Sequence, residues 1–300
     1  MNSIDTKAPT VVVKLQGGIG NQLFQHAFGQ YLQIHTKCTV KYATDSFATD
    51  PYGRKSVLQR IDSDIPLIAM VDLDFENTRI LKEDALLGRL DPSALESMLR
   101  EHSITTCVLD GYWQDLNCIP PEYKTWLNEK LSAIFVAAVH DPQDILMPIV
   151  AVPNSIGVHV RRHDYKHHGI CNENFYIDGL QWLLAVDPQA SVFVFSDEPN
   201  YTGLFLREAG IHHRIVASGD DLKDLYAMTK CNKHIIANSS FSWWGAMLAS
   251  STLPIFPMPW SFVQTPSETL FPSAWRSVDD AVEKHLSKLN YSEQLNLIQL

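Results

Sequence analysis

Apolar residues in the second half of the chain alternate between short buried-strand runs and longer stretches with helical spacing. The runs predict strands at residues 156–160, 192–196, 214–216, 234–237 and 253–256. The stretches between them predict helices at residues 175–185, 201–209, 222–229 and 241–249. Alternation of strands and helices with short connections indicates a parallel, doubly wound α/β sheet.

The first half begins with the same unit. A buried strand at residues 11–15 leads into a glycine-rich turn and a helix that carries Leu23, Phe24, Ala27 and Phe28 on one face. A second strand is predicted at residues 105–109 and a helix at residues 120–135. Prolines interrupt the apolar runs between residues 45 and 110, so apart from the strand at residues 105–109 we expect only mixed loops and helices there.

Three prolines, at positions 142, 148 and 153, interrupt a stretch with neither helical nor strand periodicity. Such a stretch is typical of a linker between domains. We therefore predict two domains, residues 1–150 and residues 151–300, and 300 residues are enough for two cores.

The charge balance excludes one broad class of function. A formal net charge of −10 argues against a general nucleic-acid-binding protein, which needs a basic face. An anionic ligand must therefore be held by a local positive pocket.

The cysteine pattern and the hydropathy of the chain indicate the cellular compartment in which the protein is expected. The five cysteines are scattered and odd in number, which favours reduced thiols in a cytoplasmic protein. The beginning of the chain lacks the pattern of a signal peptide, and no apolar run is long enough for a membrane span. We expect a cytoplasmic protein without integral membrane association, compatible with peripheral binding at the inner membrane face.

Charged and small polar residues gather where the predicted strands of the second half end. Arg161, Arg162 and Asp164 lie at the end of the first strand, Ser196, Asp197 and Glu198 at the end of the second, and Asn238, Ser239 and Ser240 at the end of the fourth. Parallel strands end at one edge of their sheet, so these segments should converge. Guanidinium groups are suited to phosphate oxygens, although a structural Arg–Asp ion pair is the alternative.

The segment around Ser239 and Ser240 stands where a helix begins. Hydroxyl groups and free backbone N–H groups at such a point can hold a phosphate, or the serines can simply cap the helix. Trp243 and Trp244, which follow, are expected in the core.

The glycine-rich turn Gly17–Gln22 has two interpretations. It can receive a polar ligand at the helix N-terminus, where the amides of Asn21 and Gln22 can bond sugar hydroxyls, or it can be only a tight packing turn. A dinucleotide-binding fingerprint fits poorly, because Leu23 stands where the third glycine belongs. This disfavours an NAD-dependent oxidoreductase.

Other polar and aromatic patterns are less specific. Tyr112 and Trp113 follow a predicted strand and could form a sugar-binding surface or pack in the core. The acidic pairs Asp62/Asp64 and Asp72/Asp74 have the spacing of metal-binding carboxylates, but we expect both to be solvated. The cluster of His163, His167 and His168 lacks the further ligand of a zinc site, so no metal site is predicted.

Three stretches together resemble the α-1,2-fucosyltransferase family: LQGGIGNQLFQHAFG, GVHVRRHDY and ANSSFSWWGA. The resemblance implies a glycosyltransferase B-type fold, with two Rossmann-like domains facing a cleft. It implies GDP-L-fucose as donor, a galactose-terminated glycan as acceptor (lipid-linked or lactose-type), and inversion without a cofactor or an obligatory metal. The first domain would lie on the acceptor side, and the second would bind GDP-fucose.

The resemblance also implies roles for individual residues. Arg161 matches the arginine that neutralises the diphosphate, His159 a histidine near the nucleotide, and Asp224 an acidic residue that reads guanine. Ser239 and Ser240 match phosphate-binding serines, and Asp164 is the nearest candidate for the general base. The further predicted substrate contacts are Gly18, Gly20, Asn21, Gln22, Arg162, Asp197, Asn238 and Phe241. His163 stands where the family usually has glycine.

Two alternatives share these motifs. One is a fucosyltransferase that makes another linkage. The other is a protein that binds a GDP-sugar or a glycan without catalysing transfer.

Overall fold

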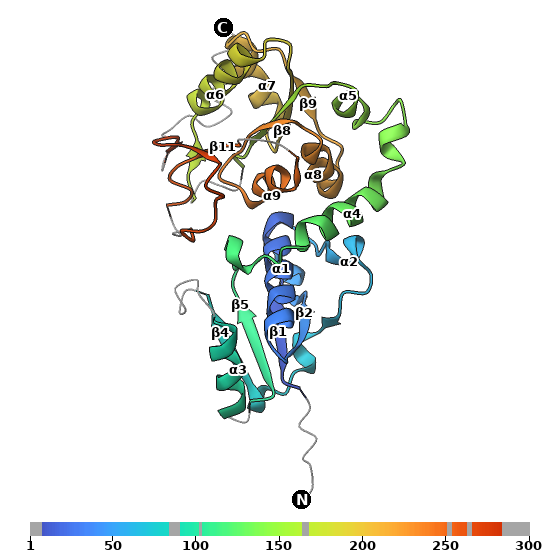
Figure 1. Ribbon diagram of the computed structural model, residues 1–300, viewed down its shortest axis with the longest axis vertical. Helices are drawn as coiled ribbons and strands as arrows, with labels where there is room; N and C mark the ends of the chain where they lie inside the picture. Colours follow the sequence, from blue (N-terminus) through green and yellow to red (C-terminus); the bar gives the residue numbers. More distant parts are fainter. Residues whose placement is uncertain are drawn as a thin grey trace, which may run out of the picture. The chain divides into compact units, whose positions relative to one another are not determined.

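The computed structural model describes residues 8–83, 91–101, 104–163, 168–250, 254–262 and 266–283. The chain forms two compact units. Unit 1 comprises Met1–Ala137 and Ser267–Pro272, and unit 2 comprises Ala138–Pro266 and Ser273–Leu300. Each unit is an α/β structure built on its own parallel sheet (Figure 1).

Unit 1 carries a five-stranded parallel sheet in the order β3-β2-β1-β5-β4. Its strands are β1 (Thr10–Lys14), β2 (Thr39–Ala43), β3 (Leu67–Ile68), β4 (Thr78–Lys82) and β5 (Thr106–Asp110). Its α-helices are α1 (Ile19–His35), α2 (Leu58–Ile61), α3 (Pro92–Glu101) and α4 (Tyr123–Phe135). Its 3-10 helices are η1 (Asp45–Thr49), η2 (Met70–Asp72), η3 (Phe75–Asn77) and η5 (Leu116–Cys118).

The central strand of unit 1 is buried on both faces, as a continuous run of valines requires. Val12 packs with Val108 and Leu73 on the face that η2 covers. On the opposite face α1 packs against β1 and β2, and the ring of Tyr42 lies where Gly29 of α1 leaves room for it. The sheet is therefore held between a long helix and short 3-10 segments.

Unit 2 carries a six-stranded parallel sheet in the order β12-β11-β10-β6-β8-β9. Its strands are β6 (Ser155–Val160), β8 (Ser191–Ser196), β9 (Arg214–Val216), β10 (Lys233–Ile235), β11 (Ile255–Pro257) and β12 (Arg276–Val278). A small antiparallel pair joins β7 (Ile170–Cys171) to β13 (Val282–Glu283). The helices are η6 (Ala138–His140), α5 (Met147–Val150), α6 (Glu173–Val186), α7 (Pro199–Glu208), α8 (Asp221–Thr229) and α9 (Ser240–Leu248).

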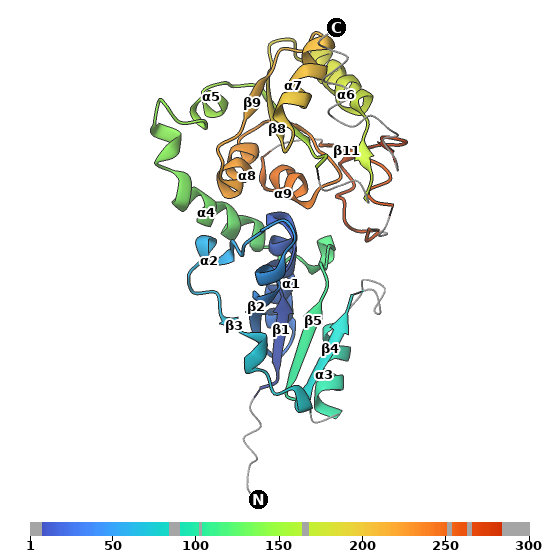
Figure 2. The same ribbon diagram turned by 180° about the vertical axis from the view of Figure 1, so that it is seen from behind.

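Helices cover both faces of the second sheet (Figures 1 and 2). Val158 of β6 packs into a core with Leu180 of α6 and Leu206 of α7. On the other face, a Cβ atom on Gly157 would lie 3.0 Å from the Cys231 sulfur, so α8 and the turn after it approach the strand closely. The predicted doubly wound α/β sheet is thus confirmed.

The helices and strands predicted in the second half agree with the structure to within a few residues at each described end. One expectation was wrong. Residues 45–110 were expected to hold only loops and helices, but they contain β3 and β4. Both strands lie at the edges of the sheet, and β4 is half exposed, so neither has the strong apolar pattern of a buried strand.

The division between the units falls after residue 137 rather than after residue 150. In addition, the segment Ser267–Pro272 belongs to unit 1. There the Ser267 hydroxyl donates to Asp115 at 2.9 Å, and the Thr269 hydroxyl donates to the same carboxylate at 2.5 Å. Local sequence composition does not predict contacts between residues so distant along the chain.

Candidate functional site

The candidate site lies at the carboxyl-terminal edge of the unit 2 sheet. The strands β10, β6 and β8 are neighbours in the sheet. The polar segments that follow them, 238–240, 161–163 and 197–198, therefore lie side by side at this edge. The chain moves from β6 to β8 and β9 on one side and returns to β10 on the other. The topological switch point therefore lies between β6 and β10, and open α/β sheets bind ligands at such points.

Asp197 holds the turn that follows β6. Its carboxylate accepts hydrogen bonds from the backbone N–H groups of Arg162 at 3.0 Å and His163 at 3.1 Å. The same carboxylate lies 3.3 Å from Nε of Arg161. We predicted Asp197 as a substrate contact, but these bonds make it the residue that positions the arginine turn.

The two arginines have different surroundings. Arg161 keeps 29% of its side chain exposed beside Asp197. Arg162 is only 11% exposed, with its Nε 3.3 Å from Glu198 and its guanidinium 4.2 Å from the centre of the Tyr201 ring. These contacts hold Arg162 against Glu198 and Tyr201, and its predicted contact with the substrate stays a prediction. Arg161 is the guanidinium that remains accessible to a ligand.

The rest of the predicted arginine motif is only partly described. Asp164, predicted as the general base, lies outside the described residues, so its role stays a prediction. His163 is described and exposed. A side chain at this position, where the resemblance leads us to expect glycine, therefore faces solvent in unit 2.

His159 lies inside the same edge of the sheet. Its ring packs against that of Phe241 from α9, with a centroid distance of 5.0 Å, and its Nδ1 is buried without a hydrogen-bond partner among the described residues. Burial, followed by the positive charge of Arg161, lowers the pKa of His159 to about 3. The imidazole is therefore neutral, with one nitrogen available for hydrogen bonding.

Buried neutral histidines make the stability of the protein sensitive to acid. Burial lowers the pKa of His26 and His159 to about 3 and that of His234 to about 4. In the unfolded chain these groups bind protons below about pH 6.5. The stabilisation is therefore complete above that pH and is lost as the pH falls, by up to about 1.4 kcal/mol per pH unit for each histidine.

We expect the urea midpoint of unfolding to be markedly lower at pH 5 than at pH 7. Imidazole nitrogen NMR shifts should show the same three rings still neutral at pH 5. An unchanged midpoint, or titration of the three rings near pH 6.5, would contradict this expectation.

The beginning of α9 forms the other side of the switch point. Ser239 is the N-cap residue, and its side chain makes no capping hydrogen bond. The N–H groups of a first helical turn lack acceptors within the helix and carry partial positive charge. This end of α9 is suited to an anion, and the phosphate contact predicted for Ser239 and Ser240 stays a prediction.

Asn238 has a structural role. Its amide donates to the carbonyl of Gly169 at 3.0 Å, and its oxygen lies 3.5 Å from the Cys171 sulfur. The side chain is only 2% exposed. The prediction that it contacts the substrate is therefore not supported, because these bonds tie the end of β10 to the segment before β7.

Asp224 lies in the first turn of α8. Its carboxylate accepts a hydrogen bond from the Ser218 N–H at 3.0 Å, and burial raises its pKa above the usual value. The α8 and α9 helices pack against each other. Asp224 thus lies on the helical layer that also carries Phe241, and its predicted contact with guanine stays a prediction.

In unit 1 the predicted glycine turn leads into α1. Gly18 is the N-cap residue of α1, and Gly20 is buried within the helix. A Cβ atom on Gly18 would meet nothing within 4 Å. The Asn21 amide oxygen accepts a hydrogen bond from Gln114 at 2.9 Å. The turn is therefore bordered by polar side chains and open space.

Gln22 does not match its prediction. The side chain is 1% exposed, and its amide group donates to the carbonyls of Gly17 and Lys55 at 3.1 and 3.0 Å. Its oxygen accepts from the Val57 N–H at 2.9 Å. Both amide hydrogens are used within the chain, so Gln22 fixes the turn and is not a donor to a sugar hydroxyl.

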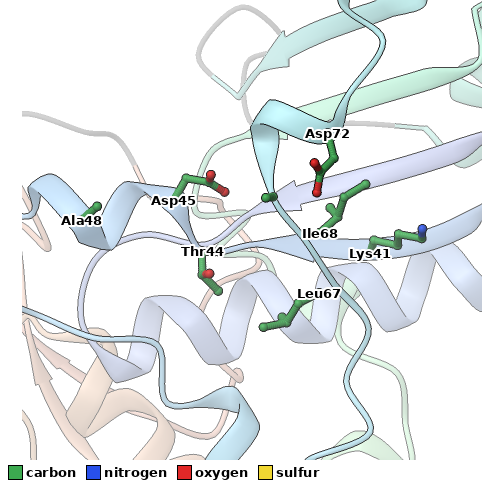
Figure 3. A pocket seen from close by; sticks show the side chains of 8 residues that line it. Lys41, Thr44, Asp45, Ala48, Leu67, Ile68 and Asp72 are labelled. Carbon is green, nitrogen blue, oxygen red and sulfur yellow. The ribbon is translucent and has the colours of Figure 1, made fainter.

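A shallow groove of about 710 Å³ lies elsewhere in unit 1, over β2 and β3 (Figure 3). Its lining residues are Lys41, Thr44, Asp45, Ala48, Leu67, Ile68, Ala69 and Asp72. Both carboxylate oxygens of Asp45 lie within 3.2 Å of the Met70 nitrogen. The groove contains none of the predicted site residues, and we do not assign it to the candidate site.

The acidic pairs in unit 1 have structural partners. Asp62 lies 2.8 Å from Lys130, and Asp74 caps η3. Within the described part of the chain, no group of three or more His, Cys, Asp or Glu residues is arranged to hold a metal ion. In the same part, no helix combines the length and the apolar character needed to cross a bilayer.

Comparison with known proteins finds glycosyltransferases. Residues 145–277 match the model of glycosyl transferase family 11. An α-1,2-colitosyltransferase from Escherichia coli is 28% identical over 277 residues, with 83% of this chain and 92% of the relative covered. The O-antigen biosynthesis glycosyltransferase WbnK, also from Escherichia coli, is 27% identical over 286 residues, with 82% and 93% covered. These matches support glycosyltransferase activity.

Among solved structures, the α-1,6-fucosyltransferase NodZ co-crystallized with GDP has a TM-score of 0.49 and 15% sequence identity. The likeness covers 81% of this chain and 93% of that one. NodZ comes from Bradyrhizobium.

Sequence reasoning missed two residues that shape these strand ends. Glu198 was noted only as a strand-end acid, but it holds Arg162. Glu83 follows β4, a strand that was not predicted, and accepts hydrogen bonds from two backbone N–H groups after β5. Its only signal was an acid placed directly after the run Thr78–Lys82.

Proposed function

We propose that the chain transfers L-fucose from GDP-L-fucose to the 2-hydroxyl of a terminal galactose, with inversion to an α linkage. The observation that carries the proposal is the meeting of Arg161, His159 and the beginning of α9 at the switch point of unit 2. The family match over residues 145–277 covers these residues.

The diphosphate of the donor would lie between Arg161 and α9. A guanidinium presents a fork of donors to phosphate oxygens. The N–H groups at the beginning of α9, with the Ser239 and Ser240 hydroxyls, supply donors on the other side. As GDP leaves, these groups stabilise its growing negative charge.

The base of the nucleotide would be recognised on the helical layer. A carboxylate accepts the two adjacent N–H donors of guanine, and Asp224 is the proposed carboxylate. The neutral His159 ring, with Phe241 against it, would form the wall beside the nucleotide.

In the reaction the galactose 2-hydroxyl oxygen attacks C1 of fucose, the bond from C1 to the phosphate oxygen breaks, and the hydroxyl proton passes to a base. The transition state resembles an oxocarbenium ion. Asp164 is the proposed base, and near-normal turnover of Asp164→Asn would refute that role. Transfer without an obligatory metal is also proposed, because Arg161 and α9 supply positive charge.

A second candidate concerns the donor sugar. The 28% identity with an α-1,2-colitosyltransferase favours colitose as an alternative donor sugar at the same site. The acceptor is proposed to be a galactose-terminated glycan, of the O-antigen or lactose type, with transfer in the cytoplasm.

The test is incubation of the purified protein with GDP-L-fucose or GDP-colitose and a panel of galactosides, including lactose. We expect GDP release with a fucosylated product, whose linkage is assigned by NMR. Calorimetry with GDP distinguishes a non-catalytic binding protein, which would bind GDP but form no product. Activity that returns after EDTA treatment only on addition of manganese would refute the metal-free mechanism.

A further inference from the structure

We propose that the carboxyl-terminal edge of the unit 1 sheet, between β1 and β5, binds the acceptor as a pyranoside. The ring of Tyr112 is the surface on which the C–H face of the sugar packs. The inference rests on the proposed function, because it assigns the second substrate of the same transfer.

Topology selects this edge. From β1 the chain proceeds to β2 and β3 on one side, and β5 and β4 lie on the other. The switch point of unit 1 is therefore between β1 and β5, just as that of unit 2 is between β6 and β10. The segments that meet there are Gln16–Gly18 after β1 and Gly111–Trp113 after β5.

The end of β5 is fixed by neighbouring polar groups. Lys14 donates to one Asp110 oxygen at 3.0 Å, and Gln16 donates to the other at 3.1 Å. The Gln25 amide then donates to the Gly111 carbonyl at 2.8 Å. The backbone that follows β5 is therefore held in place before any ligand binds.

The turn after β5 has an unfavourable conformation. Trp113 has φ of +55°, a value that bulky residues rarely adopt. Its indole N–H is buried without a partner among the described residues. Strain of this kind persists where the surroundings enforce it, and it is concentrated at functional sites.

Glu83 enforces this conformation. Its carboxylate accepts hydrogen bonds from the N–H groups of Tyr112 at 2.6 Å and Trp113 at 2.9 Å. A Cβ atom on Gly111 would lie 2.7 Å from a carboxylate oxygen of Glu83, so only glycine fits beside it. The Trp113 ring packs on Phe28 of α1 with a centroid distance of 4.7 Å.

The result of this arrangement is the position of Tyr112. Its ring lies against the glycine turn, because a Cβ atom on Gly17 would be 3.2 Å from the Tyr112 Cε1. Gly17 has φ of +78°, so the turn itself also favours glycine. Tyr112 is half-buried, so part of the ring remains accessible.

Polar and charged groups lie near this ring, and sugar recognition uses groups of that kind. Burial raises the pKa of Tyr112, while among the neighbouring charges Arg54 lowers it and Glu83 raises it. Asn21, in the first turn of α1, accepts a hydrogen bond from Gln114, the residue after Trp113, at 2.9 Å. An aromatic face with a few amide and charged groups around it suits a pyranoside, which has an apolar C–H face and a rim of hydroxyls.

The space beside Gly18 provides a second probe of the same site. A Cβ atom there meets no protein atom within 4 Å, and serine caps a helix at least as well as glycine. Gly18→Ser should therefore leave the fold intact while adding a side chain where the acceptor would lie.

The experiment measures KM for lactose and for GDP-fucose in four variants. Tyr112→Ala should raise the lactose KM roughly tenfold with little change in the GDP-fucose KM, as loss of one stacking contact predicts. Tyr112→Phe keeps the ring and should stay near the wild type. Gly18→Ser should raise the lactose KM with an unchanged Tm. Phe75→Ala, which removes a 59% exposed ring from η3 of the same unit, is the control and should change neither KM.

An unchanged lactose KM in both Tyr112→Ala and Gly18→Ser would overturn the inference and leave the proposed function standing. If Tyr112→Ala does not fold, Gly18→Ser decides the question alone. A wild-type protein that binds no GDP and releases none from GDP-fucose would instead refute the proposed function. The two failures are therefore distinguishable.

Discussion

Replacement of Arg161 by alanine is expected to lower kcat of sugar transfer by about a hundredfold or more, because it removes a preorganised charge that stabilises the leaving diphosphate. The ion pair with Asp197 is partly exposed, and such pairs contribute little to stability. The loss of activity should therefore occur without a large change in Tm. Steady-state kinetics with GDP-fucose and lactose, together with calorimetry of GDP binding, would measure it.

Two further variants define what Arg161 supplies. Arg161→Lys keeps the positive charge but loses the planar fork, so an intermediate activity is expected. Arg214→Ala removes an exposed arginine from the beginning of β9 and controls for the change in net charge. Turnover of Arg161→Ala within a few-fold of the wild type would show that the diphosphate is held elsewhere.

Replacement of Asp197 by alanine is the second large effect expected. It removes the acceptor of two backbone N–H groups and the partner of Arg161 at once. Leaving partly buried donors without an acceptor costs about 1–3 kcal/mol each. We expect a lower Tm and, because Arg161 is no longer held, a fall in kcat/KM of about tenfold to a hundredfold.

Asp187→Ala is the matched control for Asp197→Ala. Asp187 forms an ion pair of 2.8 Å with Lys233 and is 20% exposed, close to the 17% of Asp197. Lys233 begins β10, so this pair lies at the opposite end of the strands. The Asp187→Ala variant should therefore leave kcat and KM unchanged. Equal kinetic effects of the two variants would contradict a positioning role for Asp197, as would normal donor affinity in Asp197→Ala.

Local sequence pattern predicted the parts of the fold that are buried along their length. In the strand β6 and the helices α6 to α9, apolar residues recur with the spacing of a strand or a helix. Trp243 and Trp244 lie in the core as expected. The convergence of strand ends followed from the parallel sheet alone. These features depend on neighbours in sequence or on topology, which pattern can reveal.

What pattern could not predict depends on distant pairing. Asp197 and Gln22 were chosen for the chemistry of their side chains, but residues 35 positions away in each case use that chemistry within the chain. The left-handed backbone of Trp113 is enforced by Glu83, 30 residues earlier. A polar side chain that could hydrogen-bond a ligand can equally hydrogen-bond backbone groups of the protein. Only the structure shows which of these partners it has.

The return of residues 267–272 to unit 1 has a consequence for the order in which the protein is synthesised. Asp115 obtains the hydroxyl groups of Ser267 and Thr269 only after residues 138–266 of unit 2 have been synthesised. Domains generally fold as units during synthesis, beginning from the N-terminus. Unit 1 can collapse early, but these two hydrogen bonds must wait for residues 267–272, so unit 1 is completed only after most of unit 2 has been translated.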